Sequence, residues 1–315
     1  MSPSLPMKRR WRPRSDHFMA AVIAVALSMA AATGTVPAAA KPMRIVSMNL
    51  CTDQLLMLLV ERSRILSVSY LAADPRASAM ADLAAQMRLN HGLAEEIVPL
   101  NPDLVLAGAF TTRPTVFLLR KLGTPVVELP VAASLDDIRS NIRILAKAVG
   151  EPARGAALIA AFDGRLPPPR PQRAAPRPLA ALYWAGGMTS GTGTLANAVV
   201  EAAGFRTLGR ALGLSGTGQL PLETLIAAEV DVLILGHERA APALANELFR
   251  HPALRHAFAT RAKVRIPDRL WVCGTPLVAE AIAQLSALRA DIEQEAAPGA
   301  TGATRETRAT RATAK

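Results

Sequence analysis

Short apolar runs that end at polar or glycine-containing turns recur along the chain and alternate with segments of helical periodicity. In the segments between these runs, apolar residues recur three or four positions apart, as on one face of a helix. The runs predict strands at residues 44–48, 65–70, 104–107, 125–128, 179–184, 232–235 and 262–266, and the periodic segments predict helices at 54–60, 114–122, 135–149, 152–166, 195–203 and 276–292. Alternation of strands and helices predicts parallel α/β sheets.

A proline-rich stretch divides this pattern in two. A run of prolines follows the predicted helix at 152–166 and extends to Pro178, after which the strand-helix alternation starts again. Such a run cannot continue a helix and is typical of a boundary. We therefore predict an N-terminal α/β lobe at residues 41–150, an interlobe helix and connector at 151–178, and a C-terminal α/β lobe at 179–294.

The two predicted lobes share a spacing of acidic and glycine residues. In the first half, Glu95 is followed by an aspartate eight positions on and by a glycine five further on, after an apolar strand; in the second half, Glu223 is followed by Asp231 and Gly236 at the same spacings. An equivalent acidic residue on an equivalent helix in each half indicates two pseudo-equivalent lobes. Helix-turn-strand units are common, however, so a chance match stays open.

Neither end of the chain has the composition of the predicted lobes. A basic stretch from Lys8 to Arg14, an apolar run of about 15 residues and the small residues at 38–40 form the pattern of a secretory signal peptide over residues 1–40. Its cleavage, a retained anchor and a twin-arginine route through Arg9 and Arg10 all stay open. Residues 295–315 have few apolar positions and repeat Ala-Thr-Arg, which predicts a disordered tail of unknown role.

Charge gives little guidance to a partner once these ends are set aside. The net charge of +11 falls to +5 for residues 41–294, which hold 27 basic and 22 acidic residues. No interleaving of aromatic and basic residues accompanies this mild excess, so we expect no nucleic-acid partner. Signal peptide and composition together predict an exported protein of the periplasm.

No arrangement typical of a catalytic or metal site emerges. The glycine-rich stretch at 186–193 lies between a predicted strand and a predicted helix, but it lacks the lysine of a phosphate-binding loop, so we interpret it as a flexible loop beside the ligand. The five histidines form no cluster with metal-ligand spacing, and no G-x-S-x-G elbow is present. A secreted enzyme that uses this loop and Asp53 stays as an alternative, as does a periplasmic sensor.

Residues suited to ligand contact follow the predicted strands. Ligands of open parallel sheets bind beyond the carboxyl ends of strands, and several of the chain's few aromatic residues fall there. The candidate ligand-binding residues are Asn49, Cys51, Tyr70, Phe110, Arg113, Trp184, Gly186, Gly187, Trp271 and Cys273.

Four stretches together resemble the periplasmic solute-binding proteins of the iron-siderophore, haem and vitamin B12 class. They are RIVSMNLCTDQLL from Arg44, EEIVPLNPDLVLAG from Glu95, LETLIAAEVDVLILG from Leu222 and HPALRHAFATRAKVRIPDRLWVCGTP from His251. The resemblance implies two α/β lobes joined by a single long helix with a ligand cleft between them, and no enzymatic activity. It implies a monomer without a resident cofactor that captures a metal chelate, either a corrinoid such as vitamin B12 or a ferric siderophore.

The same resemblance implies a partner and a role for two acids. The partner is the permease of an ABC importer with its ATPase, and Glu95 and Glu223 match the acids that dock onto it. Cys51 and Cys273 fall on predicted cleft loops of opposite lobes, so a disulfide between them would lock the cleft; we therefore favour unpaired cysteines, with thiol contact to a metal complex as a further alternative.

Overall fold

The structure, a computed structural model, describes residues 41–168, 176–236 and 244–296. The predicted signal peptide, most of the predicted tail, part of the proline-rich connector and His237 lie outside the described residues. In the described part of the chain, no helix has the length and apolar character needed to cross a membrane.

The first lobe is built on a five-stranded parallel sheet in the order β3-β2-β1-β4-β5. Every strand predicted between residues 44 and 128 is present within one or two residues of its expected bounds. The sheet consists of β1 (Ile45–Ser47), β2 (Ile65–Ser69), β3 (Leu89–Asn90), β4 (Leu104–Gly108) and β5 (Val126–Leu129).

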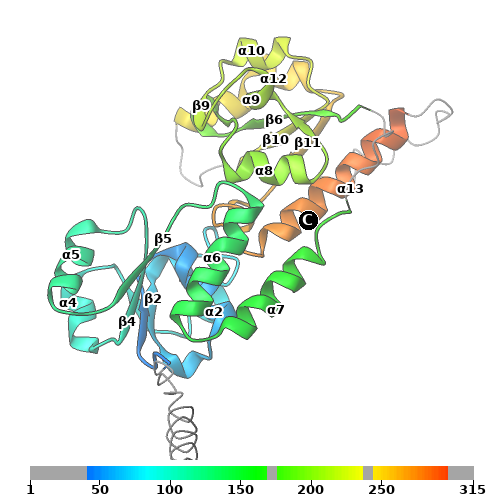
Figure 1. The fold of residues 1–315 in the computed structure, drawn as a ribbon. Coiled ribbons are helices and arrows are strands. Elements are labelled where there is room, and N and C mark those ends of the chain that lie inside the picture. The colour runs from blue at the N-terminus through cyan, green and yellow to red at the C-terminus, as the bar shows by residue number, and fades with distance from the viewer. Residues whose placement is uncertain (1–40, 169–175, 237–243, 297–315) are drawn as a thin grey trace, which may run out of the picture. The chain divides into compact units, whose positions relative to one another are not determined.

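Helices cover both faces of this sheet because neighbouring strand residues point to opposite sides. Ile45 packs with residues of α2 and α6, whereas Val46 packs with residues of α4 and α5. Figure 1 shows α2, α6 and α7 on one side of the strands and α4 and α5 on the other. The helices are α2 (Leu50–Leu59), α3 (Ala81–Ala84), α4 (Ala94–Ile97), α5 (Arg113–Lys121), α6 (Leu135–Ala148) and α7 (Pro152–Asp163).

The second lobe repeats this plan on a four-stranded parallel sheet in the order β11-β10-β6-β8. Its strands are β6 (Leu179–Tyr183), β8 (Arg206–Thr207), β10 (Val232–Leu235) and β11 (Ala262–Arg265). Its helices are α8 (Leu195–Ala202), α9 (Leu208–Ala211), α10 (Leu222–Ala227), α11 (Glu247–Arg250), α12 (Pro252–Ala257) and α13 (Val278–Ala296).

The predicted glycine-rich loop is partly strand, which corrects the sequence-based expectation. Residues Met188–Ser190 form β7, which pairs antiparallel with β9 (Thr217–Gln219). Only the flanking glycines keep turn geometry: Gly186, Gly187 and Gly193 have φ near +75°. This pairing fixes the centre of the stretch in a small two-stranded sheet, so it is not a free loop.

The repeated acidic spacing corresponds to a repeated structural unit. Glu95 and Glu223 lie in the first turns of α4 and α10. Eight residues later, Asp103 accepts hydrogen bonds from the backbone N–H of Met43 and Arg44, and Asp231 accepts one from Leu179. Each aspartate thus fixes the start of the first strand of its own sheet, which confirms two equivalent lobes.

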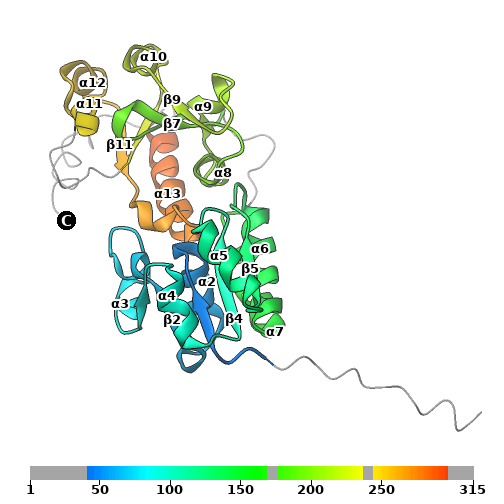
Figure 2. The same cartoon turned by 90° about the vertical axis from the view of Figure 1, so that its left-hand side faces the viewer.

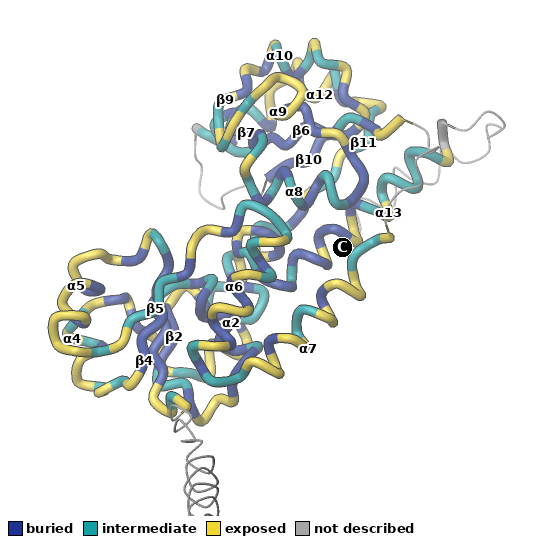
Figure 3. The backbone as a smooth tube through the Cα atoms, viewed as in Figure 1, coloured by how far each residue is buried: buried dark blue, intermediate teal, exposed yellow. Residues whose placement is uncertain are grey.

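A single apolar cluster includes residues of both sheets. Figure 2 shows α13 running from the second lobe down to the first. It combines Ile45 and Leu106 of the first lobe with Leu182 and Ile234 of the second, together with residues of α2, α6, α8 and α13. Figure 3 shows these strands and the start of α13 as buried, whereas much of α7 is exposed. The two lobes therefore pack through a shared core as well as through the chain connection.

Candidate functional site

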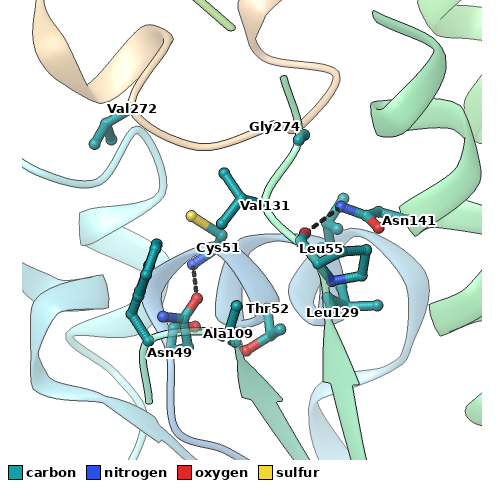
Figure 4. Close-up of a pocket in the computed structure, with 14 residues that line it drawn as sticks. Asn49, Cys51, Thr52, Leu55, Ala109, Leu129, Val131, Asn141, Val272 and Gly274 are labelled. Carbon is teal, nitrogen blue, oxygen red and sulfur yellow. Dashed lines mark hydrogen bonds between the residues drawn. The ribbon is translucent and has the colours of Figure 1, made fainter. Parts of the chain in front are cut away.

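A pocket opens at the carboxyl ends of β1, β4 and β5, where a parallel sheet is expected to bind its ligand. It has a cavity volume of about 190 Å³. Its walls come from the N-terminus of α2, the turns after β4 and β5, one residue of α6 and the chain just before α13 (Figure 4). The lining residues are Asn49, Cys51, Thr52, Leu55, Gly108, Ala109, Phe110, Leu129, Pro130, Val131, Ala132, Asn141, Val272 and Gly274.

Asn49 joins two walls of the pocket. As the N-cap of α2, its side-chain oxygen accepts a hydrogen bond from the backbone N–H of Cys51 at 3.0 Å. Its side chain also lies flat on Gly108, where an added Cβ would come within 2.8 Å of Asn49 Cγ. Glycine at the end of β4 therefore allows the capping residue to reach the pocket.

Asn141 contributes an unsatisfied polar atom beside the pocket. This residue of α6 is 4% exposed, and its side-chain nitrogen donates to the Pro130 carbonyl at 3.0 Å. Its Oδ1 is buried and has no hydrogen-bond partner among the described residues. An unpaired buried acceptor costs about 1–3 kcal/mol, so a donor that reached it would be favoured.

The two cysteines form a disulfide, which overturns the expectation of unpaired thiols. Cys51 and Cys273 are bonded, with their Cα atoms 5.1 Å apart. Cys273 is not across a cleft from Cys51: it is 2% exposed and packs with Leu50, Met57 and Val68 of the first lobe. The bond therefore joins the start of α2 to the segment before α13, which itself packs on the first lobe, so it does not bridge a gap between the lobes. Neither cysteine is a free thiol for a metal complex.

Of the ten candidate ligand-binding residues, Asn49, Cys51 and Phe110 line this pocket. Phe110 is 89% exposed in the turn after β4. Arg113 is exposed at the start of α5 and is not in the lining. Tyr70 is half exposed and stacks on His91 with ring centroids 4.9 Å apart.

Trp271 lies deeper than the predicted aromatic wall requires, whereas Trp184 is partly buried. Trp271 is 5% exposed within the shared core, and Trp184 packs against it with ring centroids 6.3 Å apart. Trp184 also covers Gly236, where a Cβ would overlap the indole ring. Gly187 is buried beneath the Leu220 carbonyl, and Gly186 is partly exposed in the same turn. The structure thus gives Trp271 a packing position, and its contact with a ligand stays a prediction.

Sequence reasoning missed most of the apolar lining. Val131 and Val272 are 60% and 54% exposed, although valines of this kind are usually placed in a core. Pro130, Ala132 and Gly274 complete the same wall. The only feature of the sequence that could have identified these residues is their position directly after β5 or shortly before α13.

Asp53 is the only carboxylate in the described residues for which burial moves the pKa to about 6, yet it is not in the pocket. It is fully buried on α2 and accepts hydrogen bonds from the backbone N–H and the hydroxyl of Ser69. Burial raises its pKa, and the hydrogen bonds from serine oppose this in part. Its contacts tie α2 to the end of β2, so they do not support the enzymatic alternative.

Glu95 and Glu223 are both exposed at the starts of their helices. In the described parts of the chain neither carboxylate takes part in an ion pair, whereas the adjacent Glu96 is bonded to His91. The described residues also contain no group of three or more His, Cys, Asp or Glu side chains that could hold a metal ion.

Comparison with curated proteins yields relatives that are named as cobalamin-binding. A cobalamin-binding protein of Halobacterium salinarum is 26% identical over 200 residues, which cover 62% of this chain and 54% of the relative. The chain thus spans about half the length of the curated relatives it matches.

Solved structures share the fold at lower identity. The periplasmic heme-binding protein RhuT from Roseiflexus sp. RS-1 superposes with a TM-score of 0.64 at 23% identity, covering 79% of this chain and 98% of that one. The periplasmic vitamin B12 binding protein BtuF of Vibrio cholerae gives a TM-score of 0.61 at 19% identity, covering 81% and 99%.

These structures confirm the predicted fold of two α/β lobes with mostly parallel sheets. The model of the periplasmic binding protein family matches residues 45–267, which include both sheets and most of the pocket lining. The chain therefore belongs to the periplasmic binding protein family.

Proposed function

We propose that this protein captures a metal chelate in the periplasm and delivers it to the permease of an ABC importer. The observation that supports the proposal most directly is the pocket at the carboxyl ends of β1, β4 and β5, with exposed apolar side chains along it. A binding protein needs such a preformed apolar site with a few polar groups, and it needs no reactive group there.

The pocket suits part of a large, mostly apolar ligand. At about 190 Å³ it is smaller than the roughly 300–1,000 Å³ that enclose a drug-sized molecule, so it would seat one edge of a macrocycle. Phe110, Val131 and Val272 are more than half exposed and provide apolar surface for the rest. Burial of that surface would supply the main binding free energy.

The lining favours a corrinoid over an anionic chelate. All fourteen lining residues are uncharged at neutral pH. Burial of the negative charges of a catecholate siderophore, or of the propionates of haem, is costly without a cationic partner. The side-chain carboxamides of a corrinoid are neutral, and the two asparagines in the lining can exchange hydrogen bonds with them.

Docking to the permease is assigned to Glu95 and Glu223. Their exposure, their equivalent positions on α4 and α10 and their lack of ion pairs among the described residues leave both carboxylates available for a basic partner surface. Exposed charges of this kind chiefly set orientation and encounter rate.

The ligand is tested by titration of the exported full chain with cobalamin, cobinamide, haem and a ferric hydroxamate siderophore, followed by tryptophan fluorescence. Cobalamin or cobinamide is expected to bind tightest. Phe110→Ala should weaken that binding about tenfold, which corresponds to about 1.4 kcal/mol. Phe117→Ala is the matched control, because Phe117 is 71% exposed on α5 outside the pocket. Failure of every chelate to bind below millimolar concentration would refute the proposal.

A further inference from the structure

One wall of the pocket comes from a distant part of the sequence. Residues 266–277, which we call the crossover segment, connect β11 to α13, and Val272 and Gly274 of this segment line the pocket. The residue between them is Cys273, which is bonded to Cys51. Cys51 is itself part of the lining, so the disulfide joins two walls of one site.

Close packing places this segment against the first lobe at the disulfide and at the residue after it. Cys273 lies in an apolar cluster with Leu50 and Met57 of α2. At Gly274, an added Cβ would overlap the side chain of Ala132, so only glycine permits this approach. The segment therefore contacts α2 and the turn after β5, both of which also line the pocket.

Hydrogen bonds do not hold the crossover segment to the first lobe. Within the segment, the Val272 N–H donates to the Asp268 carbonyl and the Thr275 N–H donates to the Cys273 carbonyl. Across residues 41–168, as far as the structure describes them, no hydrogen bond or ion pair reaches the segment. Apolar contacts tolerate sliding, whereas a covalent bond fixes position, so the disulfide is the directional constraint on this wall.

We infer that the Cys51–Cys273 disulfide positions the crossover segment as a wall of the ligand site, so that full ligand affinity requires the oxidised chain. This inference rests on the proposed function for its ligand. Disulfides persist in oxidising compartments such as the periplasm. The reduced chain, before export, would carry a loose wall and would hold the ligand weakly, which confines capture to the compartment where the ligand is collected.

The first test compares ligand affinity in the wild type and in the double variant Cys51→Ala, Cys273→Ala. Substitution is preferable to a reducing agent, because a dithiol would also reduce the metal of a chelate. Cobalamin is expected to bind the double variant about tenfold more weakly at a temperature where it remains folded. Leu225→Ala, in the core of the second lobe far from the lining, is the control for lost stability and should leave affinity unchanged.

A second measurement does not depend on any ligand. Backbone hydrogen exchange of residues 266–277 is expected to be faster in the double variant than in wild type. The same increase is expected in wild type treated with a dithiol, which is oxidised to a disulfide while it reduces Cys51–Cys273 to two thiols. Exchange in β4 should not change. Equal exchange of the segment in all three samples, or equal affinity in wild type and double variant, would overturn the inference. Absence of cobalamin binding by wild type would instead count against the proposed function, and the exchange result would still decide the role of the disulfide.

Discussion

Asp53 places an ionisable group in the interior of the first lobe, with consequences for pH. Burial raises the pKa of its carboxyl from 3.8 to about 6. Because the folded-state pKa lies above the unfolded value, the folded chain binds the proton more tightly between these pH values. The free energy of unfolding that this group contributes is therefore highest below pH 3.8, falls as pH rises to about 6 and stays low above that.

Asp53→Asn should remove this pH dependence. Asparagine can keep the hydrogen bonds to Ser69 without carrying a charge. A difference of about two pH units corresponds to about 3 kcal/mol, so the variant should gain about that much relative to wild type between pH 4 and pH 7. Urea unfolding across this range measures the difference. Asp82→Asn, on the exposed face of α3, should show no such trend; a constant offset for Asp53→Asn would contradict the assignment.

Gly236 accommodates Trp184 at the end of β10. Because a Cβ at this position would overlap the indole ring, Gly236→Ala should force Trp184 to move, at a cost of about 1–3 kcal/mol. Thermal unfolding and the tryptophan emission maximum should both change. Gly218→Ala is the control, since nothing lies within 4 Å of its added Cβ. Unchanged emission in Gly236→Ala would show that the ring does not depend on this glycine.

At the scale of single residues, position after a predicted strand identified pocket residues better than residue type did. Asn49, Cys51 and Phe110 were found because each follows a strand, and strand ends can be read from apolar patterning. Trp271 also follows a strand, yet it lies in the core, because burial depends on long-range packing that no local pattern contains. Val131 was missed for the opposite reason: an exposed valine looks like a core residue in sequence.

At the scale of elements, Asp103 and Asp231 organise the first strand of each sheet. Asp103 accepts two backbone hydrogen bonds and Asp231 accepts one. At about 1 kcal/mol for each hydrogen bond, Asp103→Ala should destabilise the fold more than Asp231→Ala. Chemical unfolding of both variants, with Asp82→Ala as an exposed control, tests the order. The reverse order would contradict the view that these backbone hydrogen bonds set the contribution of each aspartate to stability.

Strands and helices with strong local patterns were predicted within a few residues. Helix α6 begins at Leu135 as predicted, where the Ser134 hydroxyl caps it by accepting a hydrogen bond from the Asp137 N–H. The pairing of β7 with β9 was missed, because it joins residues almost 30 positions apart and glycines flank β7. Helix α13 runs to Ala296, slightly into the predicted tail. Pairings of this kind depend on tertiary contacts, which local propensity does not record.

For the whole molecule, the disulfide changes the expected relation between the lobes. Both cysteines were expected on opposite sides of a cleft, which made a bond between them unfavourable. The chain instead returns to the first lobe after β11, so cysteines with a sequence separation of 222 are bonded to each other on the first lobe. The connecting helix α7 packs along α6 and α2 of the first lobe. Because the segment before α13 is bonded to Cys51 and packs on the first lobe, it is a second connection between the halves of the chain.

Glu95 and Glu223 lie on different lobes, so the docking proposed for them requires the whole molecule. Reversal of both charges, Glu95→Lys with Glu223→Lys, should leave chelate binding unchanged, since neither residue lines the pocket. Uptake through a reconstituted importer should fall by at least tenfold, because lysines would repel a basic docking surface. Each single reversal should have a smaller effect, and Glu61→Lys, exposed on the first lobe away from α4, should have none. Loss of chelate binding in the double variant would contradict the docking role, and so would full transport, because both acids would then be ordinary surface residues.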